Sequence, residues 1–461
     1  MNGIENRRLN DRLAARRALA DACDYPEVSH RRQRLKKLLA LLIEHRKAVA
    51  AALRDDLGKS EFESYSTELL PLTDILRYLI RKLPTLAGGR RVPVSWMNFP
   101  ASGRLVPEPY GMVLVAATWN YPLLLALEPL AGAYAAGNQV VLKLHDRSSH
   151  VSGFLQWLIG EAFEEEIVVV DGECSMAELL KNKFDYIFYT GSGRGGREIL
   201  RAAAENLTPA TLELGGKSPC VVASGANLRV AARRIVWGKF TNCGQTCVAP
   251  DYLLVRSELK DALMLQLQGA IREFYGEHPL ESPDFGHVID VRAYERLSSL
   301  AANGRLICGG DKDPERLMIE PSVIDRLEKA DPLLSEEIFG PLLPVVTYDN
   351  DSDLFAELRR HGRPLALYCF GGDRKLRRKL RSGTSSGALV FDDVVTHFVN
   401  NSMPFGGVGS SGMGAYHGRR TFDTFVHLKP EMAQSSWLDL PFRYPPFSRL
   451  RTALLELLIR F

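Results

Sequence analysis

The sequence predicts an α/β protein with buried parallel sheets, built from at least two domains. Its 461 residues, 46% hydrophobic and 25% charged, are typical of a globular chain long enough for two or three domains. From Gly111 onward, short apolar runs alternate with longer helical segments, which is typical of right-handed β-α-β units. A second block, over residues 211–346, repeats this alternation. We therefore expect two parallel-sheet units along the chain.

The N-terminal segment predicts a long amphipathic helix over residues 29–56. Leucines recur there at three- and four-residue spacing, with basic residues between them. We interpret those basic residues as a solvated helix face, because 58 basic and 55 acidic side chains leave a formal net charge of only +3. No nucleic-acid partner is therefore expected. The glycine- and proline-rich residues 88–109 have no sustained period and predict a linker or an extended arm.

The alternating region predicts strands and helices in a definite order. Short apolar runs predict strands at 112–116, 140–142, 167–170 and 186–190 in the first unit and at 219–222 and 252–255 in the second, with a helix at 123–136. The most apolar stretch, 112–137, is interrupted by polar residues and prolines at 119–122 and 128–129. We do not expect it to span a membrane, since a spanning helix needs about 20 largely uninterrupted apolar residues.

Cysteine usage and the first residues indicate a reducing compartment. Seven cysteines, spread from Cys23 to Cys369, do not resemble a disulfide framework. Charges alternate near the start of the chain without an apolar stretch behind them, so no secretory signal peptide is expected. We expect a cytoplasmic protein.

The last twelve residues, 450–461, predict an amphipathic helix. Its apolar residues recur at helical spacing among Arg451, Glu456 and Arg460. Docking on the protein itself or on a partner subunit is the favoured interpretation. Contact with a membrane surface is the alternative, because terminal amphipathic helices can lie in an interface without spanning it.

A glycine-rich segment lies between an expected strand and an expected helix. Gly191 and Ser192 begin a formal G-x-G-x-x-G match, and free amides at such a helix start can bind a pyrophosphate. A plain glycine-rich turn is the alternative. In ordinary dinucleotide sites an acidic residue about 20 positions further on binds the ribose, and Glu213 lies near that distance.

Glu213 and two thiols are candidates for chemistry. Glu213 ends an apolar strand before Gly215 and Gly216, where desolvation would raise the carboxyl pKa and make it a usable base; a salt-bridged structural role is the alternative. Cys243 and Cys247 are four residues apart. No metal site is expected, because no second Cys or His pair lies nearby at ligand spacing, and burial as a core thiol is the alternative for either cysteine.

Five ordered motifs together resemble the NAD(P)-dependent aldehyde dehydrogenases. They are Thr-Trp-Asn-Tyr-Pro at 118–122, Leu-Glu-Leu-Gly-Gly-Lys at 212–217, Gly-Gln-Thr-Cys at 244–247, Glu-Glu-Ile-Phe-Gly-Pro at 336–341 and Pro-Phe-Gly-Gly-Val-Gly at 404–409. The resemblance covers nearly the whole chain. Residues 248–252 and 412–418 look most like the class 3 branch.

The resemblance implies an oxidation of an aldehyde to a carboxylic acid. Cys247 would be the nucleophile, forming a thiohemiacetal and then a thioester, while Cys243 has no implied role. Asn120 and the Cys247 backbone N–H would stabilise the oxyanion, and Glu213 would activate the hydrolytic water. We further expect a lowered thiol pKa, since the thiolate is the nucleophile. A cysteine-dependent hydrolase or acyltransferase without redox chemistry, which would need a histidine near the thiol, is the alternative.

The resemblance also implies the cofactor, the substrate and the assembly. NAD or NADP would be held by Lys143, Asp146, Gly191, Ser192, Glu337 and Phe339, with Asp146 standing where a glutamate is usual, so the preference between the two stays open. Tyr121 and Phe405 would line a tunnel for medium-chain aliphatic or aromatic aldehydes. The implied fold has a cofactor-binding domain at 1–82 and 105–212, a catalytic domain at 213–405, and an oligomerisation arm and tail at 83–104 and 406–461. A homodimer is expected.

Overall fold

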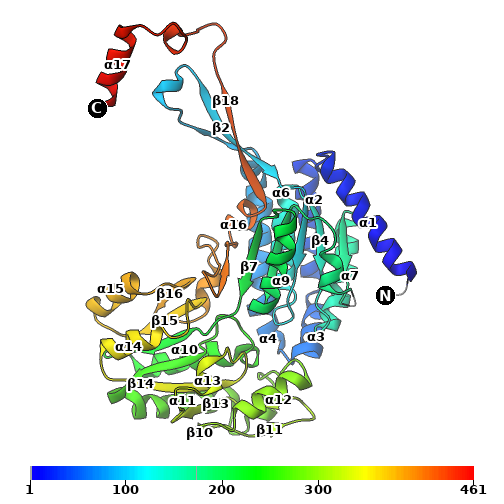
Figure 1. Ribbon diagram of the computed structural model, residues 1–461. Coiled ribbons are helices and arrows are strands. Elements are labelled where there is room, and N and C mark those ends of the chain that lie inside the picture. The colour runs from blue at the N-terminus through cyan, green and yellow to red at the C-terminus, as the bar shows by residue number, and fades with distance from the viewer. Residues whose placement is uncertain (1–2, 173, 461) are drawn as a thin grey trace.

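The computed structural model describes residues 3–172 and 174–460. Two sheets, each covered by helices, form the body, and a long antiparallel arm extends away from it (Figure 1). This arrangement confirms the predicted α/β class with parallel sheets.

The first sheet has the strand order β17-β7-β6-β3-β4-β5. Five of its strands are parallel, and β17 joins β7 antiparallel at the edge. The parallel strands are short apolar runs, largely buried, as expected for a sheet covered on both faces. Their bounds are β3 Met112–Ala116, β4 Gln139–Lys143, β5 Ile167–Val170, β6 Tyr186–Gly191, β7 Ala210–Leu214 and β17 Gly412–Met413.

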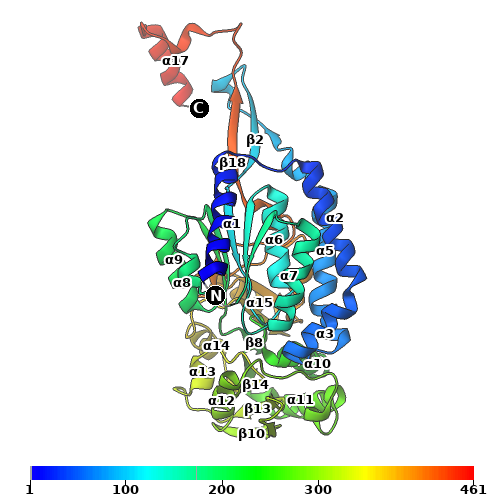
Figure 2. The same cartoon turned by 90° about the vertical axis from the view of Figure 1, so that its right-hand side faces the viewer.

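Helices cover both faces of this sheet (Figure 2). One face packs on α2 Val28–Glu44, α3 Arg46–Leu57, α5 Leu70–Ala87, α6 Leu124–Ala136 and α7 Ser149–Phe163, and the other on α1 Gly3–Asp21 and α9 Gly193–Glu205. The single helix predicted over 29–56 is wrong, because the chain breaks at His45. The His45 ring packs edge-on against Trp157 of α7 at 4.7 Å, and the break lets Val49 and Leu53 of α3 face the same core.

The second sheet has the strand order β10-β13-β14-β9-β8-β15-β16. All its neighbouring strands are parallel except β10, which pairs antiparallel with β13. The strands are β8 Pro219–Val222, β9 Tyr252–Arg256, β10 Arg305–Cys308, β13 Ser322–Asp325, β14 Leu342–Tyr348, β15 Ala366–Phe370 and β16 Ala388–Phe391. Helices α10 Leu228–Phe240, α11 Lys260–Tyr275 and α12 Val291–Leu300 cover one face, and α14 Asp351–Leu358 and α15 Arg374–Gly383 the other.

Short elements connect these layers. They are α4 Glu61–Ser64, the π-helical turn Tyr65–Leu69, α8 Met176–Leu179, β11 Lys312–Asp313, β12 Met318–Ile319, α13 Pro332–Ser335 and α16 Arg420–Asp423. The boundary expected between the cofactor-binding and catalytic domains, at residues 212 and 213, falls inside β7, which continues to Leu214. The segment 406–461, expected to form part of the arm and tail, contributes β17, which pairs with β7 in the first sheet.

The arm is a three-stranded antiparallel sheet, β1-β2-β18. It consists of β1 Arg90–Val92, β2 Ser102–Pro109 and β18 Val426–Ala433, and Trp96, Met97 and Phe99 are exposed in the β1–β2 connection. Beyond it lies α17 Arg449–Ile459, separate from the body (Figure 1). This helix buries none of its residues, so of the two forms of docking expected for it, on its own protomer or on a partner subunit, the structure does not show the first. Across residues 3–172 and 174–460, no helix has the length and apolar character needed to cross a bilayer.

Candidate active site

The candidate site lies where two neighbouring strands of the first sheet end. Residues 118–120 follow β3, and residues 190–192 end and follow β6, its neighbour in the sheet. The chain leaves β3 toward β4 on one side, whereas β6 continues to β7 on the other, so this edge is the topological switch point at which open α/β sheets bind ligands. A cavity opens here, which we call the first cavity; Asn120, Gly191, Ser192, Glu213, Cys247, Glu337, Phe339 and Phe405 are among its lining residues.

Cys247 is held by a tightly bonded loop that follows α10. Asn242 and Cys243 have positive φ values of 55° and 52°, which few non-glycine residues adopt. Gln245 fixes the loop: its Nε2 donates to the backbone oxygens of Asn242 and His287 at 3.1 and 3.0 Å, and its Oε1 accepts from Ile289 N–H. Asn242 N–H also donates to Glu63 Oε1 at 2.8 Å, so hydrogen bonds from several parts of the chain fix the loop that carries the Cys247 thiol.

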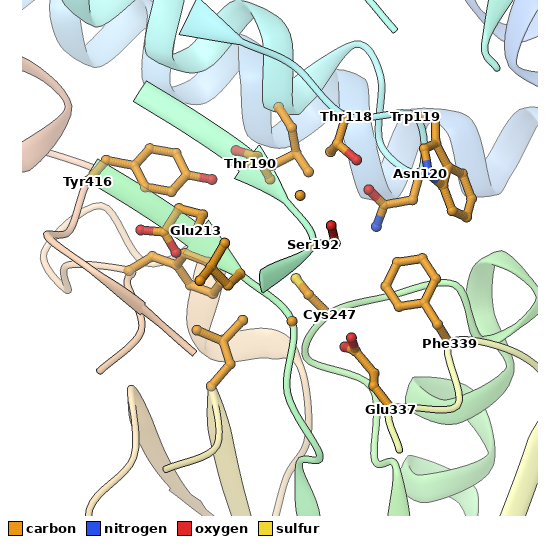
Figure 3. A pocket seen from close by; sticks show the side chains of 16 residues that line it. Thr118, Trp119, Asn120, Thr190, Ser192, Glu213, Cys247, Glu337, Phe339 and Tyr416 are labelled. Atoms are coloured by element: carbon orange, nitrogen blue, oxygen red, sulfur yellow. The ribbon is translucent and has the colours of Figure 1, made fainter. Parts of the chain in front are cut away.

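Asn120 faces this loop from the first sheet. Its Nδ2 donates to the Gln245 backbone oxygen at 2.8 Å, and its own backbone oxygen accepts from Lys59 and from Asn242 Nδ2. Figure 3 shows Asn120, Glu213 and Cys247 directed toward one space. The sequence-predicted catalytic residues, which span positions 120–247, thus line one cavity.

Glu213 is a buried carboxylate without a partner. Its strand is fixed between β6 and β17, where Glu213 pairs with Gly412. Neither carboxylate oxygen has a hydrogen-bond partner among the described residues. Burial, with a smaller contribution from Glu128, raises the pKa of Glu213 well above its ordinary value, as the apolar sequence context predicted.

The expected lowering of the Cys247 thiol pKa is wrong for the protein alone. Burial, together with the nearby carboxylates Glu337 and Glu213, raises this pKa to about 12, although backbone amides of Cys247 and Val248 act in the opposite direction. The thiol therefore needs an added positive charge, or neutralised carboxylates, before it ionises. Cys243 is fully buried in the hydrophobic core that packs against the second sheet, and burial raises its pKa as well.

Glu337 is positioned by a buried ion pair. Lys217 Nζ contacts Asp251 and donates to the backbone oxygens of Leu333 and Glu336 at 2.7 and 2.8 Å. Glu337 accepts from Gly216 N–H at 3.0 Å, and a Cβ at Gly215 would lie only 2.1 Å from its Oε2, so a larger residue at position 215 would displace the Glu337 carboxylate. Burial raises the pKa of Glu337 to about 7.

The first cavity fits a nicotinamide nucleotide on these observations. The half-buried Glu337 carboxylate can bind ribose hydroxyls, and Phe339, packed edge-on against Trp119 at 5.4 Å, forms an apolar wall beside Cys247. Gly191 and Ser192 line the same cavity, and Ser192 caps α9 by accepting from Gly195 N–H.

Lys143 and Asp146 lie outside the residues that line this cavity. Lys143 Nζ donates to the backbone oxygens of Leu144 and Asp171 at 2.9 and 2.5 Å. The Asp146 side chain is 72% exposed and pairs with His145. Lys143 is the last residue of β4, the next strand of the sheet beyond β3, and Asp146 follows that strand.

A second cavity meets the first at Cys247, which lines both. Tyr121 and Phe405 line it, and Tyr121 Oη hydrogen-bonds Thr246 Oγ1 at 2.6 Å. Among the lining residues that sequence reasoning missed are Glu128, Trp237, Phe398 and His417. The one sequence signal for them was Glu128, a carboxylate inside an otherwise apolar helix. Among the described residues, no histidine hydrogen-bonds the Cys247 thiol; His417, which lines the same cavity, contacts Glu128.

Comparisons with known proteins agree with this geometry. The model of the aldehyde dehydrogenase family matches residues 11–430. The chain is 40% identical over 423 residues to aldehyde dehydrogenase family 3 member A2 of Pongo abelii, covering 91% of this chain and 87% of the relative. It is 40% identical over 418 residues to the dimeric NADP-preferring aldehyde dehydrogenase of Rattus norvegicus, covering 90% and 92%.

A solved structure gives the same result. The substrate-bound state of Staphylococcus aureus AldH matches with a TM-score of 0.94 and 36% identity, and the match covers 100% of each chain. The resemblance inferred from the five motifs is therefore confirmed. The chain belongs to the aldehyde dehydrogenase family.

Proposed function

We propose that Cys247, Asn120 and Glu213 carry out the oxidation of an aldehyde to a carboxylic acid, the activity of this family. The observation that carries the proposal is that Cys247 lines both cavities, so that an aldehyde bound in the second can react beside a nicotinamide bound in the first. The enzyme uses NAD or NADP. When bound, this cofactor supplies a hydride acceptor and a positive charge close to the thiol.

In the first half of the proposed reaction, Cys247 Sγ, as the thiolate, bonds to the carbonyl carbon. The carbonyl oxygen becomes an oxyanion, to which Asn120 Nδ2 and the Cys247 backbone N–H donate. For this, Asn120 Nδ2 exchanges its bond to the Gln245 oxygen for one to the substrate. The thiohemiacetal carbon then loses its hydrogen with the electron pair of the C–H bond, and the carbonyl re-forms as a thioester on Cys247.

In the second half, Glu213 takes a proton from water, whose oxygen bonds to the thioester carbon. The C–S bond then breaks and returns its electron pair to Cys247, and the carboxylic acid leaves. Two features of Glu213 support this role. Its pKa is raised, and neither of its oxygens has a hydrogen-bond partner among the described residues that would compete with the water.

Stopped-flow absorbance at the NADH band tests these assignments. Cys247→Ala should give no burst of reduced cofactor, whereas Glu213→Gln should give a burst and then stall at the thioester. Asn120→Ala should slow the burst by roughly 10²–10³-fold. Cys243→Ala is the matched control: this thiol is buried in the core, so its removal should leave the burst in place. Equal turnover by Cys247→Ala and the unmodified enzyme would overturn the proposal.

For the cofactor, we propose that Glu337 and Phe339 hold the nicotinamide ribose and ring, and that Gly191 and Ser192 face the pyrophosphate. Lys143 and Asp146 are proposed for the adenosine ribose, beyond the first cavity. The Asp146 side chain is exposed and is shorter than that of a glutamate. We therefore propose both NAD and NADP as cofactors. Initial rates at varied concentrations of each cofactor, with Asp146→Ala beside the unmodified enzyme, measure this preference.

The proposed substrates are medium-chain aliphatic or aromatic aldehydes. Aromatic and aliphatic side chains line most of the second cavity, among them Tyr121, Trp237, Phe398 and Phe405. An apolar tunnel binds an apolar chain or ring through burial of its surface. Values of kcat/KM over aldehydes of increasing chain length, with benzaldehyde included, test this assignment.

We also propose a homodimer that forms through the arm, in the cytoplasm. The exposed Trp96, Met97 and Phe99 give the arm an apolar surface for a second copy. All seven cysteines are unpaired, which suits a reducing compartment. Sedimentation of the purified chain, with Trp96→Ser as the variant, tests the dimer. For α17, the partner subunit is favoured over a membrane surface, and co-sedimentation with lipid vesicles separates the two.

A further inference from the structure

The wall of the second cavity contains a buried charge pair that the mechanism above does not use. Glu128 lies on α6, and His417 lies 289 residues further along the chain, just before α16. His417 Nδ1 lies 2.9 Å from Glu128 Oε1, and Thr421 Oγ1 donates to the same oxygen at 2.9 Å. Glu128 and His417 are only 2% and 5% exposed.

The second oxygen of Glu128 is free. Both hydrogen bonds to this carboxylate end on Oε1, and Oε2 accepts none from the residues that the structure describes. Glu128 lines the second cavity, so Oε2 is available to a molecule bound there. A carboxylate oxygen that lines an apolar cavity and has no donor from the described residues can accept a hydrogen bond from a bound molecule.

The position of Glu128 indicates which part of a substrate it meets. Leu124, Leu125 and Glu128 lie on one face of α6 at helical spacing, and all three line the cavity. Four residues of helix separate Leu124 from Glu128 by about 6 Å along the axis. Asn120, the oxyanion residue, lies before the start of this helix. Glu128 therefore faces the body of a bound aldehyde rather than its carbonyl group.

The partner of Glu128 indicates the charge of the group that it takes. His417 contacts the same carboxylate. Burial lowers the pKa of His417, but the charge of Glu128 and its hydrogen bond to the ring outweigh burial and raise the pKa above its ordinary value, which favours the charged imidazole. A protonated His417 offsets the negative charge of Glu128. A neutral donor such as a hydroxyl group then suits Oε2 better than an ammonium group, which would place a second cation beside His417.

We propose that Glu128, anchored by His417 and Thr421, is a specificity-determining residue that selects aldehydes whose apolar body carries a hydroxyl group. The proposal rests on the function proposed above and narrows its substrate class. The hydroxyl donates to Glu128 Oε2, while the surrounding Trp237, Phe398 and Phe405 contact the apolar part of the substrate.

A matched set of substrates tests this inference. We would measure kcat/KM for benzaldehyde, for its three monohydroxy isomers and for the corresponding methoxy compounds, which keep a similar ring but cannot donate. The unmodified enzyme should prefer the hydroxy over the methoxy compound for at least one ring position. Comparing variants by this ratio cancels the intrinsic reactivity of each aldehyde.

Three variants complete the experiment. Glu128→Leu should lower the hydroxy-to-methoxy ratio by roughly tenfold or more, the loss expected for a hydrogen bond to a charged group. Glu128→Gln keeps an acceptor for His417 and Thr421 and should lower it by a smaller factor, since the charge is lost. Thr67→Val is the control, because Thr67 lines the same cavity but its hydroxyl already donates to the Glu63 backbone oxygen at 2.7 Å. Its ratio should equal that of the unmodified enzyme.

Two results would overturn the inference. One is an equal ratio in all four proteins. The other is a shifted pH profile for benzaldehyde oxidation in Glu128→Gln with an unchanged ratio, which would mean that Glu128 acts on Glu213 and not on the substrate. Failure of the unmodified enzyme to oxidise any aldehyde of the set is distinguishable from both, because it would overturn the proposed function itself.

Discussion

Replacing Lys59 with methionine would test whether a buried ion pair holds Asn120, the proposed oxyanion residue, in place. Lys59 Nζ lies 2.6 Å from Glu68 Oε1 and 3.2 Å from the Asn120 backbone oxygen, and neither charged side chain is exposed. The same ammonium lies 4.0 Å from the centre of the Tyr121 ring. Without Lys59, the Glu68 carboxylate would be a buried charge without a counter-ion.

The size of the effect follows from this geometry. At an effective dielectric constant of about 20, two unit charges at this separation attract by roughly 6 kcal/mol, and loss of one partner of a buried pair costs about 3–5 kcal/mol. Lys59→Met should therefore lower the free energy of unfolding by about 3–5 kcal/mol. The double variant Lys59→Met/Glu68→Gln should recover much of this, because a glutamine oxygen can still accept from Leu123 and Leu124 N–H, which now bond Glu68 Oε2.

Urea unfolding followed by circular dichroism measures the stability, and steady-state kinetics measure the effect on Asn120. We expect kcat of Lys59→Met to fall by roughly tenfold, less than for complete loss of an oxyanion donor, because Asn242 still contacts the Asn120 oxygen. The reasoning is refuted if the single variant unfolds within about 1 kcal/mol of the unmodified protein. It is also refuted if the double variant is no more stable than the single one.

Three further predictions follow from the site. Burial raises the pKa of Glu213. At a pH between the unfolded and the folded pKa, the folded protein keeps the carboxyl proton and the unfolded protein loses it. The free energy of unfolding therefore falls as the pH rises. In urea unfolding, Glu213→Gln should therefore gain stability relative to the unmodified protein as the pH rises above the ordinary carboxyl pKa, and a constant difference would contradict this. Gly412 has a φ of 141°, and a Cβ there would lie 2.1 Å from the Leu212 oxygen, so Gly412→Ala should cost about 1–3 kcal/mol and slow acid release. Its control is Gly153→Ala, which meets nothing within 4 Å in α7 and should be neutral or stabilising; equal effects of the two would argue against strain at Gly412. Lys217→Met should raise KM for NAD(P) more than it lowers kcat, because Lys217 holds the backbone that precedes Glu337. Initial rates at varied cofactor concentration measure both constants, and an unchanged KM would exclude this role of Lys217.

The sequence predicted the strands well because each is a short apolar run between turn residues. The runs at 167–170 and 219–222 match β5 and β8 without any shift of bounds. Hydrophobic periodicity says less about where a helix is interrupted, because that depends on tertiary contacts. The leucine pattern continues through His45, and only the packing of His45 on Trp157 shows where one helix ends and the next begins.

The residue types of the site and the raised pKa of Glu213 were predicted from the sequence, but the raised pKa of Cys247 was not. The motifs placed Cys247, Asn120 and Glu213 together, and all three line one cavity. The raised pKa of Cys247 comes from burial and from Glu337, 90 residues away in the chain, and no local pattern reports such a neighbour. Likewise, the sequence indicates only that Glu128 interrupts an apolar helix, whereas the structure places His417 and Thr421 within hydrogen-bond distance of its carboxylate.

The central claim is that Cys247 carries the acyl group between oxidation and hydrolysis. The most direct measurement is the mass of Glu213→Gln after reaction with an aldehyde and NAD(P), quenched in acid and mapped by peptide. We predict a mass increase equal to one acyl group on the peptide containing Cys247, reversed by hydroxylamine and abolished by Cys247→Ala. An unmodified Cys247 during cofactor reduction, or an acyl group on Cys243 or another side chain, would contradict the account.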